Sequence, residues 1–147
     1  MLRDSIANDM RDAMKARDAT RVAALRLLMS SVKVVEKEKL HDLSDDEVLD
    51  VIAREAKRRR ESIDMFGQGG RTDLVDKETA ELKILEGYLP DKLSDADLAT
   101  LVDEAIAETG ASTPKQMGEV MKALMPKVRG RADGGQVSAL VKSRLGA

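Results

Sequence analysis

The chain has 147 residues, 42% hydrophobic and 35% charged, which is enough to build one domain core or two small helical ones. The 25 Lys and Arg residues nearly balance 27 Asp and Glu residues, which argues against coating nucleic acid or membranes through bulk charge. Cysteine is absent, which excludes disulfides, a thiol nucleophile and a zinc ribbon. One Phe, one Tyr and no Trp argue against a module that stacks single-stranded bases on aromatic rings. No long apolar run or signal peptide is recognisable, so we expect a soluble cytoplasmic protein.

Helical periodicity runs nearly from end to end, and no alternating strand pattern is convincing, so the sequence predicts an all-α fold. The first half predicts four helices. They are expected over residues 2–16, from Asp18 through Val35, over about 45–66 and over about 73–88. Ser44 and Glu47 form a capping box before the third of these, and the glycines of 67–70 predict the turn that follows it.

The second half predicts three more helices. Ser94 and Asp97 begin the first, which ends at Gly110, and residues 113–116 form a capping box with proline at the first helical position. Pro126 is expected to prevent regular continuation of the second helix. The third is expected to begin with a cap formed by Asp133 and Gln136. We therefore predict an N-terminal four-helix subdomain over residues 1–90 and a C-terminal three-helix subdomain over residues 91–147.

No arrangement of residues in the sequence predicts catalysis. His41 is the only histidine and has no Cys, second His or serine at a recognisable spacing, so an exposed loop position is favoured. The glycine cluster lacks the GK[ST] ending of a phosphate loop, and the dispersed carboxylates show no metal-loop spacing. We therefore expect no catalytic residue, no metal and no cofactor, and an independent enzyme ranks last.

One ion pair is predicted from the helical periodicity. Arg59 and Glu78 each fall within the apolar arc of their own helix at 100° per residue. If these two helices fold back on each other about Gln68–Gly69, Arg59 comes opposite Glu78. The two residues then form a partly buried structural pair, because either charge alone would be destabilising there. The basic cluster of residues 54–60, which is interleaved with acids, is better explained as a solvated face.

The second half is electrically polarised along its sequence. Residues 93–114 contain five acids and no Lys or Arg, whereas residues from Lys115 onward contain seven basic residues and two acids. Lys127, Arg129 and Arg131 are expected in the connection between Pro126 and the Asp133 cap. A basic connection next to the start of a helix can bind phosphate, and Gly130 would let the backbone approach the phosphate. The candidate RNA-contacting residues are Lys122, Lys127, Arg129, Arg131 and Lys142.

Two segments, GGRTDLVDKETAELKILEGYLPDKLSD (69–95) and MGEVMKALMPKVRGRADGGQVSALVKSRL (117–145), contain YLP, MG-x-VMK and KVRGRADG. Through this combination the chain resembles the GatB/YqeY family, as a stand-alone YqeY-like protein. The second segment is similar to the tail module of the B subunit of aspartyl/glutamyl-tRNA amidotransferases. In that enzyme the tail contacts tRNA, and other parts carry out carbon–nitrogen ligation with glutamine as amide donor. Gly134-Gly135 departs from the proline that the tail module often has there.

Two functional hypotheses follow. The first is a tRNA-binding accessory protein of the amidotransferase system without an active site of its own, favoured by the resemblance and by the polarised tail. The second is a helical protein–protein adaptor in translation, favoured by the low net charge and the few aromatics. Its partner would be the amidotransferase or another translation protein. Neither DNA nor a membrane is expected as a partner.

Overall fold

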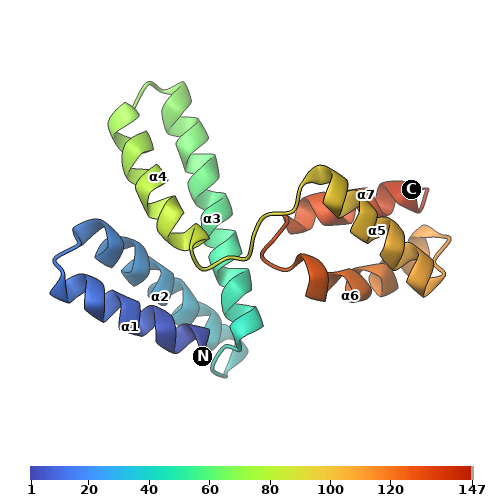
Figure 1. Cartoon of the computed structure of the whole chain (residues 1–147), viewed down its shortest axis with the longest axis horizontal. Coiled ribbons are helices and arrows are strands. Elements are labelled where there is room, and N and C mark those ends of the chain that lie inside the picture. Colours follow the sequence, from blue (N-terminus) through green and yellow to red (C-terminus); the bar gives the residue numbers. More distant parts are fainter. Residues whose placement is uncertain (147) are drawn as a thin grey trace. The chain divides into compact units, whose positions relative to one another are not determined.

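The computed structural model describes residues 1–146, which contain seven α-helices, one short 3-10 helix and no strand (Figure 1). The helices are α1 (Leu2–Lys15), α2 (Ala19–Lys39), α3 (Asp45–Gln68), α4 (Thr72–Glu86), α5 (Asp95–Thr109), η1 (Pro114–Gln116), α6 (Met117–Val128) and α7 (Gly134–Arg144). The all-α prediction is confirmed for these residues. None of the described helices is both long enough and apolar enough to cross a membrane.

Backbone contacts divide the chain into two compact units, Met1–Leu89 (unit 1) and Pro90–Ala147 (unit 2). Unit 1 consists of two helical hairpins, α1–α2 and α3–α4. Its buried apolar cluster consists of Ile6, Leu25, Leu28, Val32, Leu43, Val48, Val51, Ile52 and Leu85. The α3–α4 hairpin contributes only the first part of α3 and the last part of α4 to this cluster. The rest of the hairpin extends beyond the core (Figure 1).

The start and end of α3 follow directly from local sequence. Glu47 N donates to Ser44 Oγ at 3.3 Å, and Ser44 N donates to Glu47 Oε1 at 3.1 Å, which completes the predicted capping box. Beyond Gln68, Gly70 adopts a positive φ of 71°, which glycine tolerates without steric strain. The turn is closed by Arg71 N, which donates to Phe66 O at 2.9 Å.

Tyr88 connects the end of unit 1, just after α4, to α1. The Tyr88 hydroxyl donates to Asp9 Oδ2, and Arg21 of α2 lies 3.9 Å from the same carboxylate oxygen. Burial of the ring, followed by the hydrogen bond to Asp9, raises the pKa of Tyr88 above its ordinary value of 10.

Unit 2 packs α5, α6 and α7 around its own apolar cluster. The buried members are Leu93, Leu98, Val102, Ala105, Ala111, Val120, Leu124, Val128, Val137, Val141 and Leu145. The segment that enters the unit is fixed to the α6–α7 connection, because Leu93 N donates to Arg131 O at 2.9 Å.

Two details of unit 2 differ from the sequence prediction. Pro126 lies inside α6, which continues to Val128. The helix ends soon after the proline, so little of it depends on the missing N–H, and burial of Val128 holds the last turn in place. Asp133 occupies the N-cap position of α7, but its side chain accepts no capping hydrogen bond. Gln136 is instead turned towards α5, where Nε2 donates to Asp95 Oδ1 at 3.1 Å.

Candidate functional site

The α3–α4 hairpin contains a buried ionic cluster. Arg59 Nη1 of α3 lies 2.9 Å from Glu78 Oε2 of α4 and donates a second hydrogen bond to Glu81 Oε2. The side chains of Arg59 and Glu81 are only 10% and 4% exposed. The structure thus contains the Arg59–Glu78 pair and adds a second carboxylate. Glu81 could have been found from the sequence, since residues three apart share a helix face.

The cluster is suited to fixing the register of the hairpin. A slip of one helix past the other would leave a buried guanidinium or carboxylate without a partner, which is strongly destabilising. Arg59 is occupied by these contacts and does not offer its charge to a ligand phosphate.

Beyond this cluster the hairpin continues as two helices alone, and we call residues 60–77 the distal arm. Its apolar residues Ile63, Phe66, Leu74 and Val75 are half-buried and lie outside the core cluster of unit 1. Met65 is 71% exposed. Two helices without a third layer cannot bury their apolar faces completely. The distal arm therefore presents apolar side chains that another molecule could cover.

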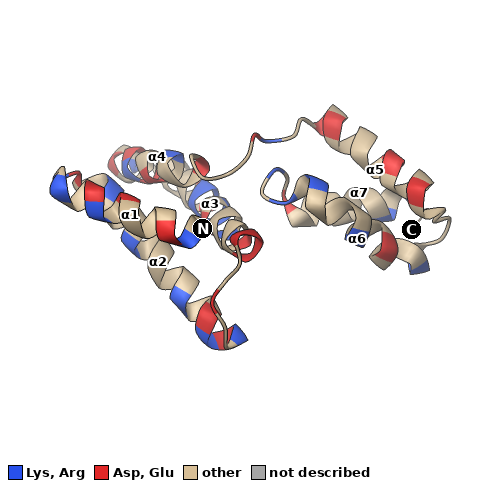
Figure 2. Ribbon diagram, turned by 60° about the horizontal axis from the view of Figure 1, so that its bottom comes forward, with Lys and Arg blue, Asp and Glu red and all other residues tan. Residues whose placement is uncertain are grey.

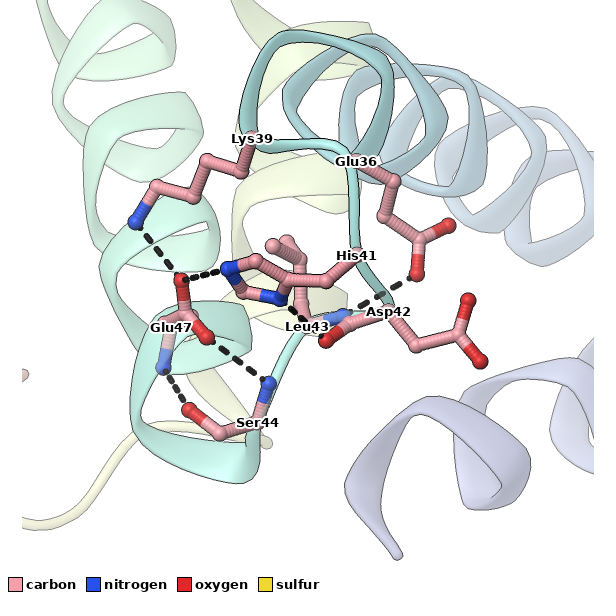
Figure 3. Close-up of polar contacts among 7 residues, drawn as sticks. All are labelled: Glu36, Lys39, His41, Asp42, Leu43, Ser44 and Glu47. Carbon is pink, nitrogen blue, oxygen red and sulfur yellow. Dashed lines mark hydrogen bonds and ion pairs between the residues drawn. The ribbon is translucent and has the colours of Figure 1, made fainter.

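The corner between α2 and α3 contains a dense set of polar contacts (Figure 3). Lys39 Nζ donates to Glu47 Oε2 at 2.6 Å, and this hydrogen bond is the main reason why the pKa of Glu47 falls from 4.5 to about 2. The exposed ring of His41 lies nearby, with Nε2 3.8 Å from Glu47 Oε2 and Nδ1 2.7 Å from Asp42 O. These contacts hold the cap of α3 in place.

On the other side of the same corner, Glu36 Oε2 accepts a hydrogen bond from Leu43 N at 3.1 Å (Figure 3), and Glu36 Oε1 accepts one from Arg3 Nη2 at 3.0 Å. Nowhere in residues 1–146 do three or more His, Asp or Glu side chains form a group that could hold a metal ion.

The candidate RNA-contacting residues of unit 2 have different surroundings. Lys127 lies in the last turn of α6 rather than in the connection, with Nζ 3.5 Å from Glu108 Oε1 of α5. Arg131 Nε donates to Asp91 O at 3.0 Å. Arg129 is the half-buried C-cap residue of α6. Lys122 and Lys142 are exposed on α6 and α7. At least Lys127 and Arg131 are thus engaged in contacts within the unit.

The acidic and basic segments of unit 2 lie against each other. α5, with its acidic residues, packs on α6 and α7, which carry basic residues (Figure 2). Its carboxylates pair with their cations, as in Arg144 Nε to Asp103 Oδ1 at 3.1 Å. The charge asymmetry that favoured a phosphate site therefore has a second explanation, which is complementarity between the helices of one unit.

Comparison with known proteins decides the family. The family described as Yqey-like protein matches residues 3–145. The chain belongs to this family. The YqeY-like chain has relatives that carry the name "Altered inheritance of mitochondria protein 41, mitochondrial". The relative from Lachancea thermotolerans is 32% identical over 117 residues, 76% of this chain and 63% of that protein. The relative from Pyrenophora tritici-repentis is 27% identical over 142 residues, 95% of this chain and 78% of that protein.

A third relative of that name, from Kluyveromyces lactis, is 38% identical over 85 residues, 57% of this chain and 46% of that protein. The YqeY-like chain thus spans less than two thirds of the Lachancea protein and about half of the Kluyveromyces protein.

These relatives correct two sequence-based expectations. The prediction of a tRNA-binding accessory protein of the amidotransferase system is wrong, because the relatives are named for mitochondrial inheritance rather than for tRNA or amidation. The physical basis of that prediction was a basic loop, and part of its charge is used inside unit 2. The cytoplasmic assignment is also wrong, since these relatives are named mitochondrial. It rested on the lack of cysteine and on opening residues that do not resemble a signal peptide, and neither feature specifies a compartment.

Proposed function

We propose that the YqeY-like chain is a helical protein-binding module whose distal arm receives an apolar segment of a partner protein. The observation that carries this proposal is the position of Ile63, Phe66, Leu74 and Val75. These residues lie along two packed helices, outside the core, where they are only half-buried. Apolar side chains on a rigid scaffold are the usual centre of a protein interface.

The charges around the distal arm support the same proposal. Arg60 pairs with Glu86 at 3.4 Å and Arg71 pairs with Asp73 at 3.2 Å, so several charged groups at the arm already have partners. An apolar centre with a polar rim is typical of protein interfaces. The ionic cluster at the base of the arm keeps both helices in register, which preorganises the surface and lowers the entropy lost on binding.

We also propose that the two units act as separate subdomains, four helices over residues 1–90 and three helices over residues 91–147. This division is supported by the two compact units and by their two distinct apolar clusters. Protein binding at the distal arm would then need unit 1 alone.

Site-specific photocrosslinking in the source cells tests the binding proposal. A photoreactive phenylalanine analogue at position 67 would report the arm, because Gly67 is exposed and a Cβ added there meets no atom within 4 Å. The matched control is the same analogue at Ala139, an exposed position on α7. We expect a discrete protein adduct from position 67 that is lost in the Phe66→Ala variant, and none from position 139.

Phe66 is half-buried and lies outside the core cluster of unit 1, so the Phe66→Ala substitution should leave that core intact, which circular dichroism verifies. An adduct of twice the mass of the chain would identify the partner as a second copy. Equal crosslinking with and without Phe66→Ala would contradict the proposal, as would no adduct at position 67.

A further inference from the structure

The outer face of α2 carries two parallel rows of side chains that are not explained by packing within unit 1. At 100° per residue, Arg26, Lys33 and Lys37 fall within about 40° of one another and form a basic row. Leu27 and Val34, seven residues apart, form an apolar row about 90° further round the helix. All five residues are exposed. The small residues Ala23 and Ser30 lie between the rows.

The apolar row is unusual for this chain. Leu27 is 54% exposed, Val34 is 56% exposed and Leu40, the C-cap residue of the same helix, is 89% exposed. Together they are three of the six large hydrophobic side chains that are exposed in the described residues. One helix and its cap thus account for half of the exposed large apolar side chains. Such a concentration marks an interaction surface more often than isolated exposed leucines do.

The basic row has no counter-charge within the structure. In residues 1–146, none of Arg26, Lys33 and Lys37 forms an ion pair, although neighbouring cations such as Arg3, Arg21 and Lys39 do. α2 contains two acids. Glu36 is turned inward to Arg3 and to Leu43 N, and Glu38 lies on the last turn, at the edge of this face. The outer face therefore combines unneutralised positive charge with exposed apolar surface.

We propose that the outer face of α2 binds an anionic lipid surface, with the helix lying parallel to that surface. A bilayer boundary supplies both components at once, because phosphate headgroups attract the basic row and the underlying acyl region accepts Leu27 and Val34. It also accommodates a convex helix without a shape-matched groove, which an acidic protein partner would have to provide. This surface is separate from the distal arm.

The expectation of no membrane partner rests on the overall charge, which is −2. At an ionic strength of ~0.1 M, charges more than about 10 Å apart are largely screened, so a local basic row acts independently of the net charge.

Co-sedimentation of the full chain with vesicles tests the proposal. The probes are vesicles of equal parts phosphatidylcholine and phosphatidylglycerol, and vesicles of phosphatidylcholine alone. We expect sedimentation with the anionic vesicles only. Each cation near such a surface contributes about a fivefold factor to the partition coefficient. The triple variant Arg26→Gln/Lys33→Gln/Lys37→Gln should therefore bind roughly 100-fold more weakly, and Leu27→Ser/Val34→Ser about tenfold more weakly.

The matched control is Lys115→Gln/Lys122→Gln/Lys142→Gln, which removes three exposed lysines from unit 2 and changes the net charge by the same amount. Its partition coefficient should equal that of the parent. Thermal unfolding of each variant checks that the fold is retained.

Four results would overturn the proposal. They are no binding of the parent to anionic vesicles, an equal loss in the unit 2 control, full binding by the Leu27→Ser/Val34→Ser variant, and binding to soluble polyglutamate as strong as to vesicles. The last result would assign the face to an acidic protein.

Discussion

Arg59 occupies a position where the periodicity of α3 would otherwise place an apolar side chain. Its guanidinium is shared by Glu78 and Glu81, and only Glu78 has appreciable contact with solvent. A buried charge of this kind is stable only while its partners are present, and replacing a whole ionic group by apolar residues is often neutral. The cluster is therefore expected to specify how α3 and α4 pair more than to add net stability.

We predict that Arg59→Met lowers the free energy of unfolding by about 3–5 kcal/mol, because Glu81 is left as a buried carboxylate without a counter-charge. The triple variant Arg59→Met/Glu78→Met/Glu81→Leu should recover most of this loss. Both quantities come from denaturant unfolding followed by circular dichroism. A triple variant as unstable as Arg59→Met would show that the lost stability has another origin, such as packing of the arginine stem.

Glu47 gives the corner between α2 and α3 a defined acid sensitivity. Its pKa in the folded protein is about 2, against an ordinary value of 4.5, mainly because Lys39 donates a hydrogen bond to it. A carboxyl group with a depressed folded-state pKa contributes stability that is fully present above its unfolded pKa. That contribution is lost as the pH falls through the folded pKa.

We therefore predict that the stability difference between the parent and Glu47→Gln is constant above pH 4.5 and shrinks as the pH falls from 4.5 to about 2. Thermal unfolding at a series of pH values measures this difference. Glu38→Gln, at an exposed acid on the last turn of α2, is the control variant. A pH-independent difference for Glu47→Gln would refute the assignment.

At the scale of elements, local signals in the sequence predict most helix boundaries because caps act over three or four residues. The Ser44–Glu47 box, the Ser94 cap and the turn at 67–70 are all formed. Asp133 and Gln136 have the same spacing as a capping box but form none, because Gln136 donates to Asp95 of α5. A tertiary partner of this kind cannot be read from the α7 sequence alone.

The candidate sites are likewise predictable from the sequence only where local periodicity determines them. Helical periodicity brings Arg59 opposite Glu78, but the pairing of Lys127 with Glu108 and of Arg131 with Asp91 O depends on how α5 packs against α6. The outer face of α2 was not predicted as a site. Its signal, cations at i, i+7 and i+11 beside leucine and valine at i+1 and i+8, is present in the sequence, but which face is exposed depends on the packing of the other helices.

Two glycines of unit 2 should respond oppositely to alanine. Gly110 ends α5 with a φ of 65°, so Gly110→Ala should lower the free energy of unfolding by about 1 kcal/mol. Gly118 lies in α6 with no atom within 4 Å of an added Cβ, so Gly118→Ala should raise it by about 0.5 kcal/mol. Chemical denaturation of both variants gives the two values. A stabilising Gly110→Ala would contradict the left-handed end of α5.

At the scale of the whole molecule, charge is balanced unit by unit. Residues 90–147 contain eight acids and eight Lys and Arg residues, so the net charge of −2 belongs to unit 1. Although its sequence is polarised, unit 2 therefore has no net charge, and some of its acidic and basic residues form ion pairs with each other. This explains how a basic tail sequence can suggest phosphate binding although several of its cations serve the fold.

We predict that residues 1–89 expressed alone retain protected amides in the core cluster of unit 1, and that residues 90–147 alone are only marginally stable. A domain of about 60 residues buries a smaller fraction of its surface than a larger domain does, and unit 2 has no disulfide to add stability. Hydrogen exchange of both fragments and of the full chain measures this. Uniformly rapid exchange in residues 1–89 would show that unit 1 does not fold alone, and equal protection of residues 90–147 in both contexts would show that unit 2 is more stable than expected.

The contact between Tyr88 and Asp9 has a mechanical consequence. Tyr88 lies two residues before Pro90, where the chain leaves unit 1. Its hydroxyl donates a hydrogen bond to Asp9 of α1, near the other end of the unit's sequence. A pulling force applied through unit 2 would therefore be transmitted through this hydrogen bond to α1 as well as along the backbone of α4. The Tyr88→Phe substitution would remove this hydrogen bond and leave α4 alone to carry the force. The α3–α4 hairpin, which contains the distal arm, would then begin to detach from its carboxyl end at a lower force.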